Sequence, residues 1–245
     1  MKKILFAFAL MLAPALTWAG EGGCGEVKCD VVKIDLHDKP SLQNGARIFV
    51  NYCLSCHSAA YMRYNRMGQD LGISEELVES SLLFAADKVG DPMKAVMPRD
   101  DAKDWFGTAP PDLTLEARSR GPEWIYTYLR SFYRDDKSPS GWNNTVFANV
   151  AMPHVLYEWQ GEQRALFKKD EKGMTHFEGF EMARPGSMSK ADYDKAMRDL
   201  TNFFVYMGEP AKLERAEIGG WVIAFLLVLL VLTYLLKKSY WKDVK

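Results

Sequence analysis

Cysteine is scarce in this chain, which has only four among its 245 residues. Two of them, Cys53 and Cys56, form a Cys-x-x-Cys pair, and no second pair lies at zinc-knuckle spacing. A structural zinc site, which needs four ligands, is therefore disfavoured. No predicted strand of a βαβ pattern precedes the pair, which argues against a thioredoxin-like redox motif. Internal repeats and low-complexity tracts are also missing, which excludes a repeat architecture.

The chain as a whole also lacks an excess of one charge, with a formal net charge of −1. Charge is distributed unevenly along the chain, however. Six lysines lie in residues 1–19 and 217–245, and the acidic residues there are only Glu217 and Asp243. Residues 20–216 keep 25 basic and 30 acidic residues, a net charge of −5. Such a domain suits a basic partner and argues against binding of nucleic acid.

A histidine follows the cysteine pair directly, so that residues 53–57 read Cys-Leu-Ser-Cys-His. This pentapeptide is the attachment signature of a c-type haem. Thiols about one helical turn apart can form thioethers with the two haem vinyl groups, and His57 then becomes the proximal iron ligand. The motif occurs once, so one covalent haem c is predicted. A periplasmic thiol–disulfide oxidoreductase that uses Cys53 and Cys56 is the rival of another class, and a haem stain after denaturing electrophoresis separates the two.

The N-terminus is interpreted as a signal peptide, residues 1–19. Lys2 and Lys3 give a positive start, an apolar run follows, and Thr17-Trp18-Ala19 ends it at the positions that a signal peptidase reads. An uncleaved N-terminal anchor is the alternative, which the shortness of the apolar run disfavours. Export fits covalent haem, which bacteria attach outside the cytoplasmic membrane.

A second apolar segment, Ile218 to Leu236, lies near the C-terminus and has no charge among its nineteen residues. At about 1.5 Å per residue it spans roughly 28 Å, close to the core of a bilayer. Trp221 and Tyr234 lie near its ends, where aromatic rings favour the interface. The basic tail, residues 237–245, is predicted to be cytoplasmic, which leaves residues 20–217 as a periplasmic domain on the bacterial inner membrane. A buried core helix is the alternative.

The two remaining cysteines, Cys24 and Cys29, are five positions apart near the predicted mature N-terminus. In an oxidising compartment they can form a small disulfide loop. A lipid-modified Cys24 is the competing interpretation, although Glu21-Gly22-Gly23 is a poor signal for lipidation.

Apolar periodicity predicts a mainly α fold with long loops. Residues 91–111 and 139–157 are expected to be irregular, and residues 163–182 are expected to form a small β-hairpin with its turn near 170–173. Gly45 and Phe49 share one helix face and suit a close helix crossing. The expected helices are 42–58 after an N-cap at Ser41 and ending in the haem motif, 75–89 after Ser74, 122–132 with Pro122 in its first turn, and 190–207 after Ser189 and ending at Gly208.

An electron-transfer haem usually has a second axial ligand, and a methionine thioether there raises the reduction potential while a second histidine lowers it. Two methionines on predicted loops are each followed by proline, Met97 and Met152, and His154 is a third candidate. His37 and His176 are weaker candidates, because nothing around them resembles a binding loop. The residues alone leave the choice open.

The haem segment Asn51 to Ser58 resembles that of the cytochrome c1 family. So do Ala109 to Thr114, which reads Ala-Pro-Pro-Asp-Leu-Thr, and the following Arg118-Ser119-Arg120. Ala151-Met152-Pro153 lies where that family places its methionine ligand, and the family also has one C-terminal anchor with a basic tail. The resemblance covers nearly all of residues 33–245.

The resemblance implies that Met152 is the distal ligand and that Arg120 pairs with a haem propionate, a charge-assisted bond that arginine geometry favours. It also implies that Pro110 or Pro111 packs near the proximal face and offers a carbonyl to the second nitrogen of His57. Between Asp100 and Phe106 this chain departs from mitochondrial relatives, which have small polar residues there, so no haem contact is predicted from that stretch.

The function that the resemblance implies is the haem c subunit of a bacterial ubiquinol–cytochrome c reductase. Its partners would be cytochrome b and a Rieske iron–sulfur protein in a dimeric complex, with a periplasmic c-type cytochrome as acceptor. The chain would be an electron carrier without catalytic residues of its own, and the complex would be the enzyme. The rivals are an anchored monohaem cytochrome that serves a terminal oxidase or another dehydrogenase, and a ligand-binding haem sensor with five-coordinate iron.

Overall fold

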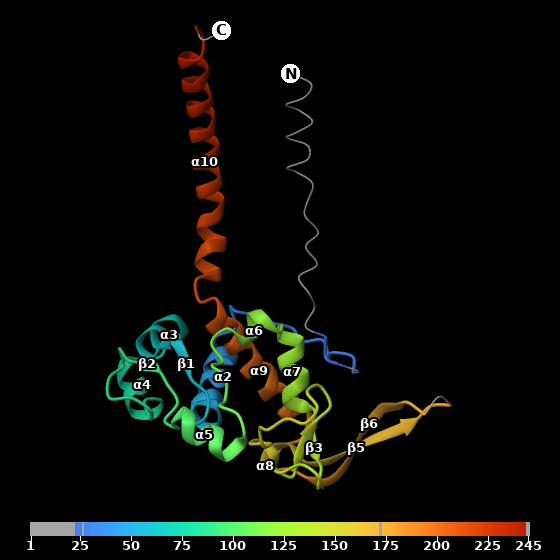
Figure 1. Ribbon diagram of the computed structural model, residues 1–245. Coiled ribbons are helices and arrows are strands. Elements are labelled where there is room, and N and C mark those ends of the chain that lie inside the picture. The colour runs from blue at the N-terminus through green and yellow to red at the C-terminus, as the bar shows by residue number, and fades with distance from the viewer. Residues whose placement is uncertain (1–22, 26, 172, 244–245) are drawn as a thin grey trace.

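The computed structural model describes residues 23–25, 27–171 and 173–243. They form a mainly helical domain with three small antiparallel sheets and a long C-terminal helix that projects away from it (Figure 1). The predicted fold class, mainly α with a small β-hairpin, is confirmed. The predicted signal peptide, residues 1–19, lies outside the described residues.

The core is built on a crossing of helices α2 (Lys39–Tyr52) and α9 (Lys190–Gly208). A Cβ added to Gly45 would overlap the Asp199 carbonyl oxygen and lie 2.6 Å from Cβ of Phe203, so the two backbones nearly touch there. The Phe49 ring lies 5.8 Å from the Phe203 ring and 5.9 Å from the Phe204 ring. The close crossing expected from Gly45 and Phe49 is therefore present.

The predicted bounds of α2 are wrong at both ends. Asp38, not Ser41, is the N-cap, and its carboxylate accepts the backbone N–H of Ser41. Ser41 lies within the helix and is buried, and its hydroxyl donates to the Asp199 carboxylate of α9 at 2.8 Å. The helix ends at Tyr52, so the haem motif lies in the turns that follow, where the His57 N–H donates to the Cys53 carbonyl at 2.8 Å.

Strand β1 (Ala59–Arg63) and helices α3 (Tyr64–Leu71) and α4 (Glu75–Ser81) come next. Ser74 caps α4 as predicted, but the helix ends at Ser81 and not near Val89. The chain turns there and runs back along α3, where the Asn65 N–H donates to the Val89 carbonyl at 2.7 Å. Tertiary pairing therefore outweighs the apolar periodicity of this segment.

The predicted loop 91–111 contains strand β2 (Pro92–Met93), which pairs with β1, and helix α5 (Arg99–Phe106). The prediction of a wholly irregular segment is wrong because its prolines all lie outside α5. Pro98 immediately precedes the helix, and Gly107 ends it with φ 74°. Helix α6 (Glu116–Ser119) is short, and α7 (Pro122–Arg130) begins at the predicted proline.

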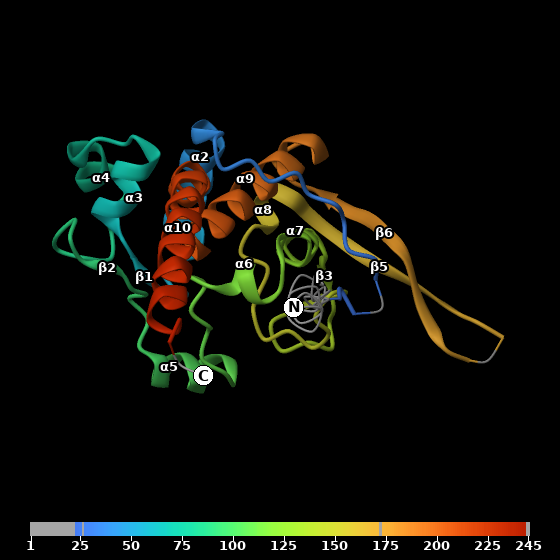
Figure 2. The same cartoon turned by 90° about the horizontal axis from the view of Figure 1, so that it is seen from above.

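Residues 139–157 are largely irregular, as predicted, apart from strand β4 (Trp142–Asn144), which pairs with β3 (Phe132–Arg134). Helix α8 (Tyr157–Gln160) leads into strands β5 (Gly161–Lys169) and β6 (Thr175–Pro185). The predicted hairpin is thus confirmed and is longer at both ends. Figures 1 and 2 show it as an arm that extends sideways from the domain.

Helix α10 (Lys212–Tyr240) contains the whole apolar segment predicted to span a membrane, and its side chains are exposed along its length. Among the residues that the structure describes, α10 is the one helix that is long enough and apolar enough to cross a bilayer. Figure 1 shows it leaving the domain near the end of α9 and projecting away from the other helices.

Cys24 and Cys29 form a disulfide, which removes the alternative of a lipid-modified Cys24 for this chain as folded. The segment after it packs on α7, where the Asp30 N–H donates to Thr127 Oγ1 at 2.8 Å. Arg130 of α7 binds the Asp30 carboxylate at 2.5 Å and the Asp194 carboxylate of α9 at 2.7 Å. One guanidinium therefore joins the N-terminal segment to both helices.

Replacing both Cys24 and Cys29 with serine is expected to lower the free energy of unfolding by about 2 kcal/mol, the chain entropy that closing so short a loop removes. Denaturant unfolding of the full-length protein measures the change. Haem content should not fall, because the thiols of the haem motif are separate from this loop. Mass spectrometry of non-reduced protein that finds two free thiols at these positions would contradict the disulfide.

Candidate haem-binding site

The two thiols of the haem motif lie in the turns that follow α2, and both are free. Cys53 is buried and Cys56 is partly exposed. Burial, with a smaller effect from Cys56, raises the pKa of the Cys53 thiol to about 12. A nucleophilic redox cysteine needs a lowered pKa, so this environment argues against the thiol–disulfide enzyme. No cluster of three His, Cys, Asp or Glu side chains that could hold a metal ion occurs within the described part of the chain.

His57 is held by the segment that follows α5. Its Nδ1 lies 2.9 Å from the carbonyl oxygen of Pro111, and because that oxygen can only accept, the ring nitrogen donates. Burial lowers the pKa of His57, so the imidazole is neutral. Its Nε2 then keeps a lone pair for a metal, while the Nδ1 contact fixes the tautomer and the ring orientation. Of the two prolines considered in the sequence, Pro111 supplies the carbonyl.

The segment that carries Pro111 is clamped to the haem motif by the backbone. The Leu113 N–H donates to the Ser58 carbonyl at 2.8 Å, and the Asp112 carboxylate accepts the Ala60 N–H at 2.8 Å. The Thr114 N–H and hydroxyl also donate to Asp112, at 2.9 and 2.5 Å. The position of the Pro111 carbonyl is therefore fixed by the hydrogen bonds of the three residues that follow it.

A cavity of about 210 Å³ lies beside Cys56. The Met97 N–H donates to the Ser55 carbonyl at 3.3 Å. Met97 thus lines a cavity together with Pro110 and Asp112, the two residues that flank Pro111.

Met152 lies in a different cluster, on the loop after β4. It is partly buried and packs beside Phe132, Trp142 and Val150. The Tyr128 hydroxyl donates to its Sδ at 3.4 Å. Burial raises the pKa of Tyr128, so the hydroxyl keeps its proton.

The other histidine candidates have different environments. His154 is buried with its ring stacked on Phe132 at 4.8 Å and edge-on to Trp142 at 5.1 Å, and burial lowers its pKa to about 4. This ring is a packing element of the loop that carries Met152. His37 is exposed, and His176 lies on the hairpin, where its Nε2 is 3.1 Å from the Asp170 carboxylate.

Arg120 is connected to Met152 through the rings of Trp124 and Tyr128. It pairs with Glu116 at 2.7 Å, and its guanidinium lies 4.4 Å from the centre of the Trp124 ring. Trp124 in turn stacks on Tyr128 at 4.9 Å. Neither Trp124 nor Tyr128 was predicted from the sequence as a site residue. A signal was available, because Trp124 and Tyr128 lie four positions apart on one face of α7, and Arg120 lies four positions before Trp124.

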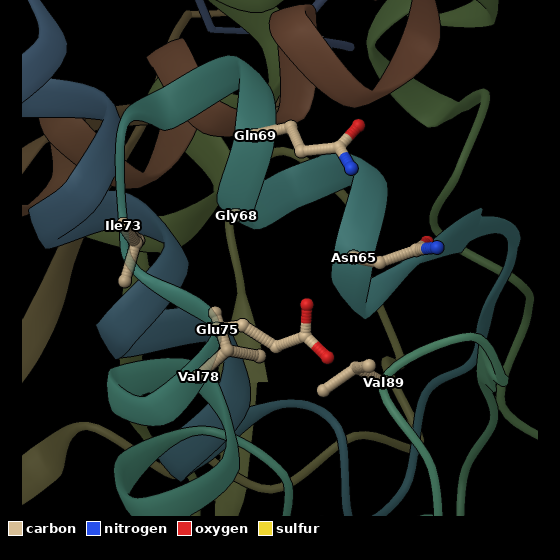
Figure 3. A pocket seen from close by; sticks show the side chains of 7 residues that line it. All are labelled: Asn65, Gly68, Gln69, Ile73, Glu75, Val78 and Val89. Carbon is tan, nitrogen blue, oxygen red and sulfur yellow. The ribbon is translucent and has the colours of Figure 1, made fainter.

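A second cavity, of about 40 Å³, lies between α3 and α4. Figure 3 shows the Glu75 carboxylate extending toward Val89 below α3, with Asn65 and Gln69 above it. The space is far too small for a porphyrin and holds none of the predicted site residues.

The donor set fits covalent haem. The free thiols of Cys53 and Cys56 lie near the neutral imidazole of His57, whose Nδ1 is held by a hydrogen bond. The thioether of Met152 lies on a separate loop, and its sulfur accepts a hydrogen bond from a tyrosine. These are the groups that attach a porphyrin and ligate its iron.

Known proteins match the chain over its whole length. The model of the Cytochrome C1 family matches residues 32–244. The cytochrome c1 of Allochromatium vinosum is 48% identical over 246 aligned positions, which cover all of both chains. A protein of Nitrosomonas europaea named ammonia monooxygenase gamma subunit is 46% identical over 245 positions, again all of both. The cytochrome c1 of Rhodospirillum rubrum is 26% identical over 277 positions, covering all of this chain and 98% of that one.

The family match and the Allochromatium vinosum relative each extend through the haem motif, the loop with Met152 and the C-terminal helix. They agree with the donor set described above. The chain therefore belongs to the cytochrome c1 family, the membrane-anchored electron-transfer subunit of the bc1 complex, which carries covalent haem c.

Proposed function

We propose that this chain takes electrons one at a time from a Rieske iron–sulfur protein and passes them to a periplasmic c-type cytochrome. The observation that carries this proposal is the hydrogen bond between His57 Nδ1 and the Pro111 carbonyl, at 2.9 Å, beside two free thiols. Haem c supplies the one-electron chemistry when it is bound. The residues of the chain attach it, orient its ligands and set the charge around it.

Each site residue then has one role. Cys53 and Cys56 form the thioethers, and His57 ligates the iron with its ring fixed by Pro111. Met152 is the second ligand, and Arg120 pairs with a propionate. None of these groups acts as an acid, base or nucleophile, so the chain alone is a carrier and the complex is the quinol–cytochrome c oxidoreductase.

The proposed membrane arrangement is supported by α10 and by the positive-inside rule. The apolar part of α10, residues 218–236, spans the bilayer, and Lys237 and Lys238 lie on the cytoplasmic side with the rest of the basic tail. After removal of residues 1–19, residues 20–217 form the periplasmic domain on the bacterial inner membrane. The bc1 complex implies cytochrome b and a Rieske protein as partners. We infer that the complex is a dimer.

Purification of the full-length protein from solubilised membranes tests the proposal. Cytochrome b and a Rieske protein should copurify with it, and a haem stain should remain on the chain after denaturing electrophoresis. An anchored cytochrome of another oxidase or dehydrogenase would lack the Rieske partner. A thiol–disulfide enzyme would show no haem stain, and a haem sensor would bind carbon monoxide readily in its five-coordinate form.

An Arg120→Ala variant is expected to retain haem and to show a lower midpoint potential, by on the order of tens of millivolts, because loss of a nearby positive charge favours the ferric state. Redox titration measures the shift. Arg118→Ala is the matched control, since Arg118 lies on α6 only two positions before Arg120 and is exposed. Equal potentials in Arg120→Ala and wild type would contradict a propionate role.

Reduction of the acceptor should depend on ionic strength. Residues 20–216 carry a net charge of −5, which favours encounter with a basic partner. Raising the salt concentration from about 0.01 M to 0.5 M shortens the screening length severalfold, and the second-order rate should fall about ten-fold or more. Stopped-flow measurement with the natural acceptor tests this. A rate independent of salt would rule out electrostatic steering.

A further inference from the structure

We propose that Tyr128 is a positioning residue for Met152, and that its hydroxyl orients the thioether and lowers the electron density on its sulfur. The inference rests on the proposed function, in which Met152 is the second ligand of the haem iron. It adds a residue that neither the haem motif nor the family match assigns.

The contact itself joins α7 to the ligand loop. The Tyr128 hydroxyl donates to Met152 Sδ at 3.4 Å, within the range of a hydrogen bond to sulfur. A thioether sulfur has two lone pairs. One accepts this bond, so the rotation of the side chain is restricted, and the other stays available to a metal.

The Tyr128 ring is fixed by its neighbours. It stacks almost parallel on Trp124, with ring centres 4.9 Å apart and planes 9° apart. It also meets Phe132 edge-on at 5.1 Å. Arg120 covers the neighbouring Trp124 ring. A ring held against two others keeps its hydroxyl in one place, which a donor needs in order to set the direction of a lone pair.

The backbone of Tyr128 holds the same loop a second time. The side chain of Asn144, which is 1% exposed, donates to the Tyr128 carbonyl at 2.8 Å. The side-chain oxygen of Asn144 accepts hydrogen bonds from the backbone N–H groups of Val146 and Phe147, at 2.9 and 3.3 Å. The chain that leads to Met152 is therefore tied to Tyr128 through the Asn144 amide as well as through the sulfur.

The physical consequence is a change in ligand strength. A hydrogen bond withdraws electron density from the sulfur, which makes it a weaker donor to ferric iron and favours the ferrous state. Loss of the hydroxyl should therefore lower the midpoint potential. At a fixed ambient potential the ratio of ferrous to ferric haem should fall about five-fold, the equilibrium factor of one ordinary hydrogen bond.

The test compares Tyr128→Phe with Tyr126→Phe in the full-length protein within its membrane complex. Tyr126 lies on the same helix, but the guanidinium of Arg130 lies 4.5 Å from its ring and no hydrogen bond to Met152 involves it. Redox titration should show the five-fold shift for Tyr128→Phe alone. The charge-transfer band of the iron–thioether bond should also move in that variant and stay unchanged in Tyr126→Phe.

A double-mutant cycle separates this proposal from the ligand assignment. In a Met152→Leu background, Tyr128→Phe should change the potential no further. The role of Tyr128 would be overturned if Tyr128→Phe had the midpoint potential of the wild type, or if it shifted the potential equally with and without Met152. Either result would leave Met152 as the ligand. An unchanged spectrum in Met152→Leu would overturn the ligand assignment and the role of Tyr128 with it.

A measurement on the wild type keeps the proposal testable if Tyr128→Phe loses its haem. In D2O the hydroxyl proton exchanges, and the iron–sulfur stretching frequency should shift, because the exchanged group is bonded to the sulfur. Tyr126→Phe should show the same isotope shift as wild type. Absence of any isotope shift in the wild type would overturn the proposal.

Discussion

Replacing Met152 with leucine is expected to remove the iron–thioether charge-transfer band and to lower the midpoint potential by on the order of 0.1–0.3 V. Axial ligands tune haem potentials over roughly 0.8 V, and loss of a soft sulfur donor removes the ligand that favours ferrous iron. Haem should remain attached, because Cys53, Cys56 and His57 are unchanged. Optical spectroscopy and redox titration of the purified protein measure both effects.

Met97→Leu is the matched control, since Met97 is also followed by proline but lies in a different place, in the lining of the cavity beside Cys56. Its spectrum and potential should stay close to those of the wild type. If Met97→Leu loses the band and Met152→Leu keeps it, the ligand assignment is reversed. The two variants therefore decide between the methionines with one preparation each.

Gly45→Ala is expected to destabilise the protein by about 3 kcal/mol or more. Its new methyl group would overlap the Asp199 carbonyl oxygen and lie 2.6 Å from Cβ of Phe203. Both obstacles are parts of α9 that cannot rotate away, so the two helices must separate and lose the packing of Phe49. Denaturant unfolding of the full-length protein in detergent measures the loss.

Gly179→Ala is the control for this substitution. A Cβ at Gly179 meets nothing within 4 Å, so the change there should stay within about 0.5 kcal/mol. Equal stabilities for Gly45→Ala and wild type would mean that α2 and α9 are not in close contact at Gly45.

Local chemistry predicted several elements well. Ser74 and Ser189 cap their helices with side-chain oxygens, and Pro122 begins α7, because each residue satisfies or removes donors at a helix start. The hairpin was predicted from a polar turn near residues 170–173. Gly45 and Phe49 indicated the helix crossing, since only a residue without a side chain permits such close backbones.

The wrong predictions concern segments whose structure depends on contacts between residues far apart in the sequence. Ser41 has the chemistry of an N-cap, but Asp199, 158 positions away, binds its hydroxyl and Asp38 takes the cap. Apolar periodicity continued past Ser81, while pairing with Asn65 ended α4 there. Proline density concealed α5, although Pro98 lies at the N-terminal end where proline is tolerated.

The haem site shows the same contrast between local sequence signals and long-range contacts. The attachment motif can be read from five consecutive residues, and the family resemblance pointed to a proline carbonyl on His57. The contact of Tyr128 with Met152 could not be read, because 24 positions of mostly irregular chain separate the two residues. No periodic pattern relates a helix to a loop of that kind.

The pairing of α2 with α9 has a consequence for the order of assembly. The first helix meets its main partner only when nearly all of the domain has emerged, since Ser41 and Asp199 are 158 positions apart. Contacts of such long range form late. We therefore expect the Cys53 thiol to be accessible until α2 and α9 close, so that the porphyrin can be joined to it before that step.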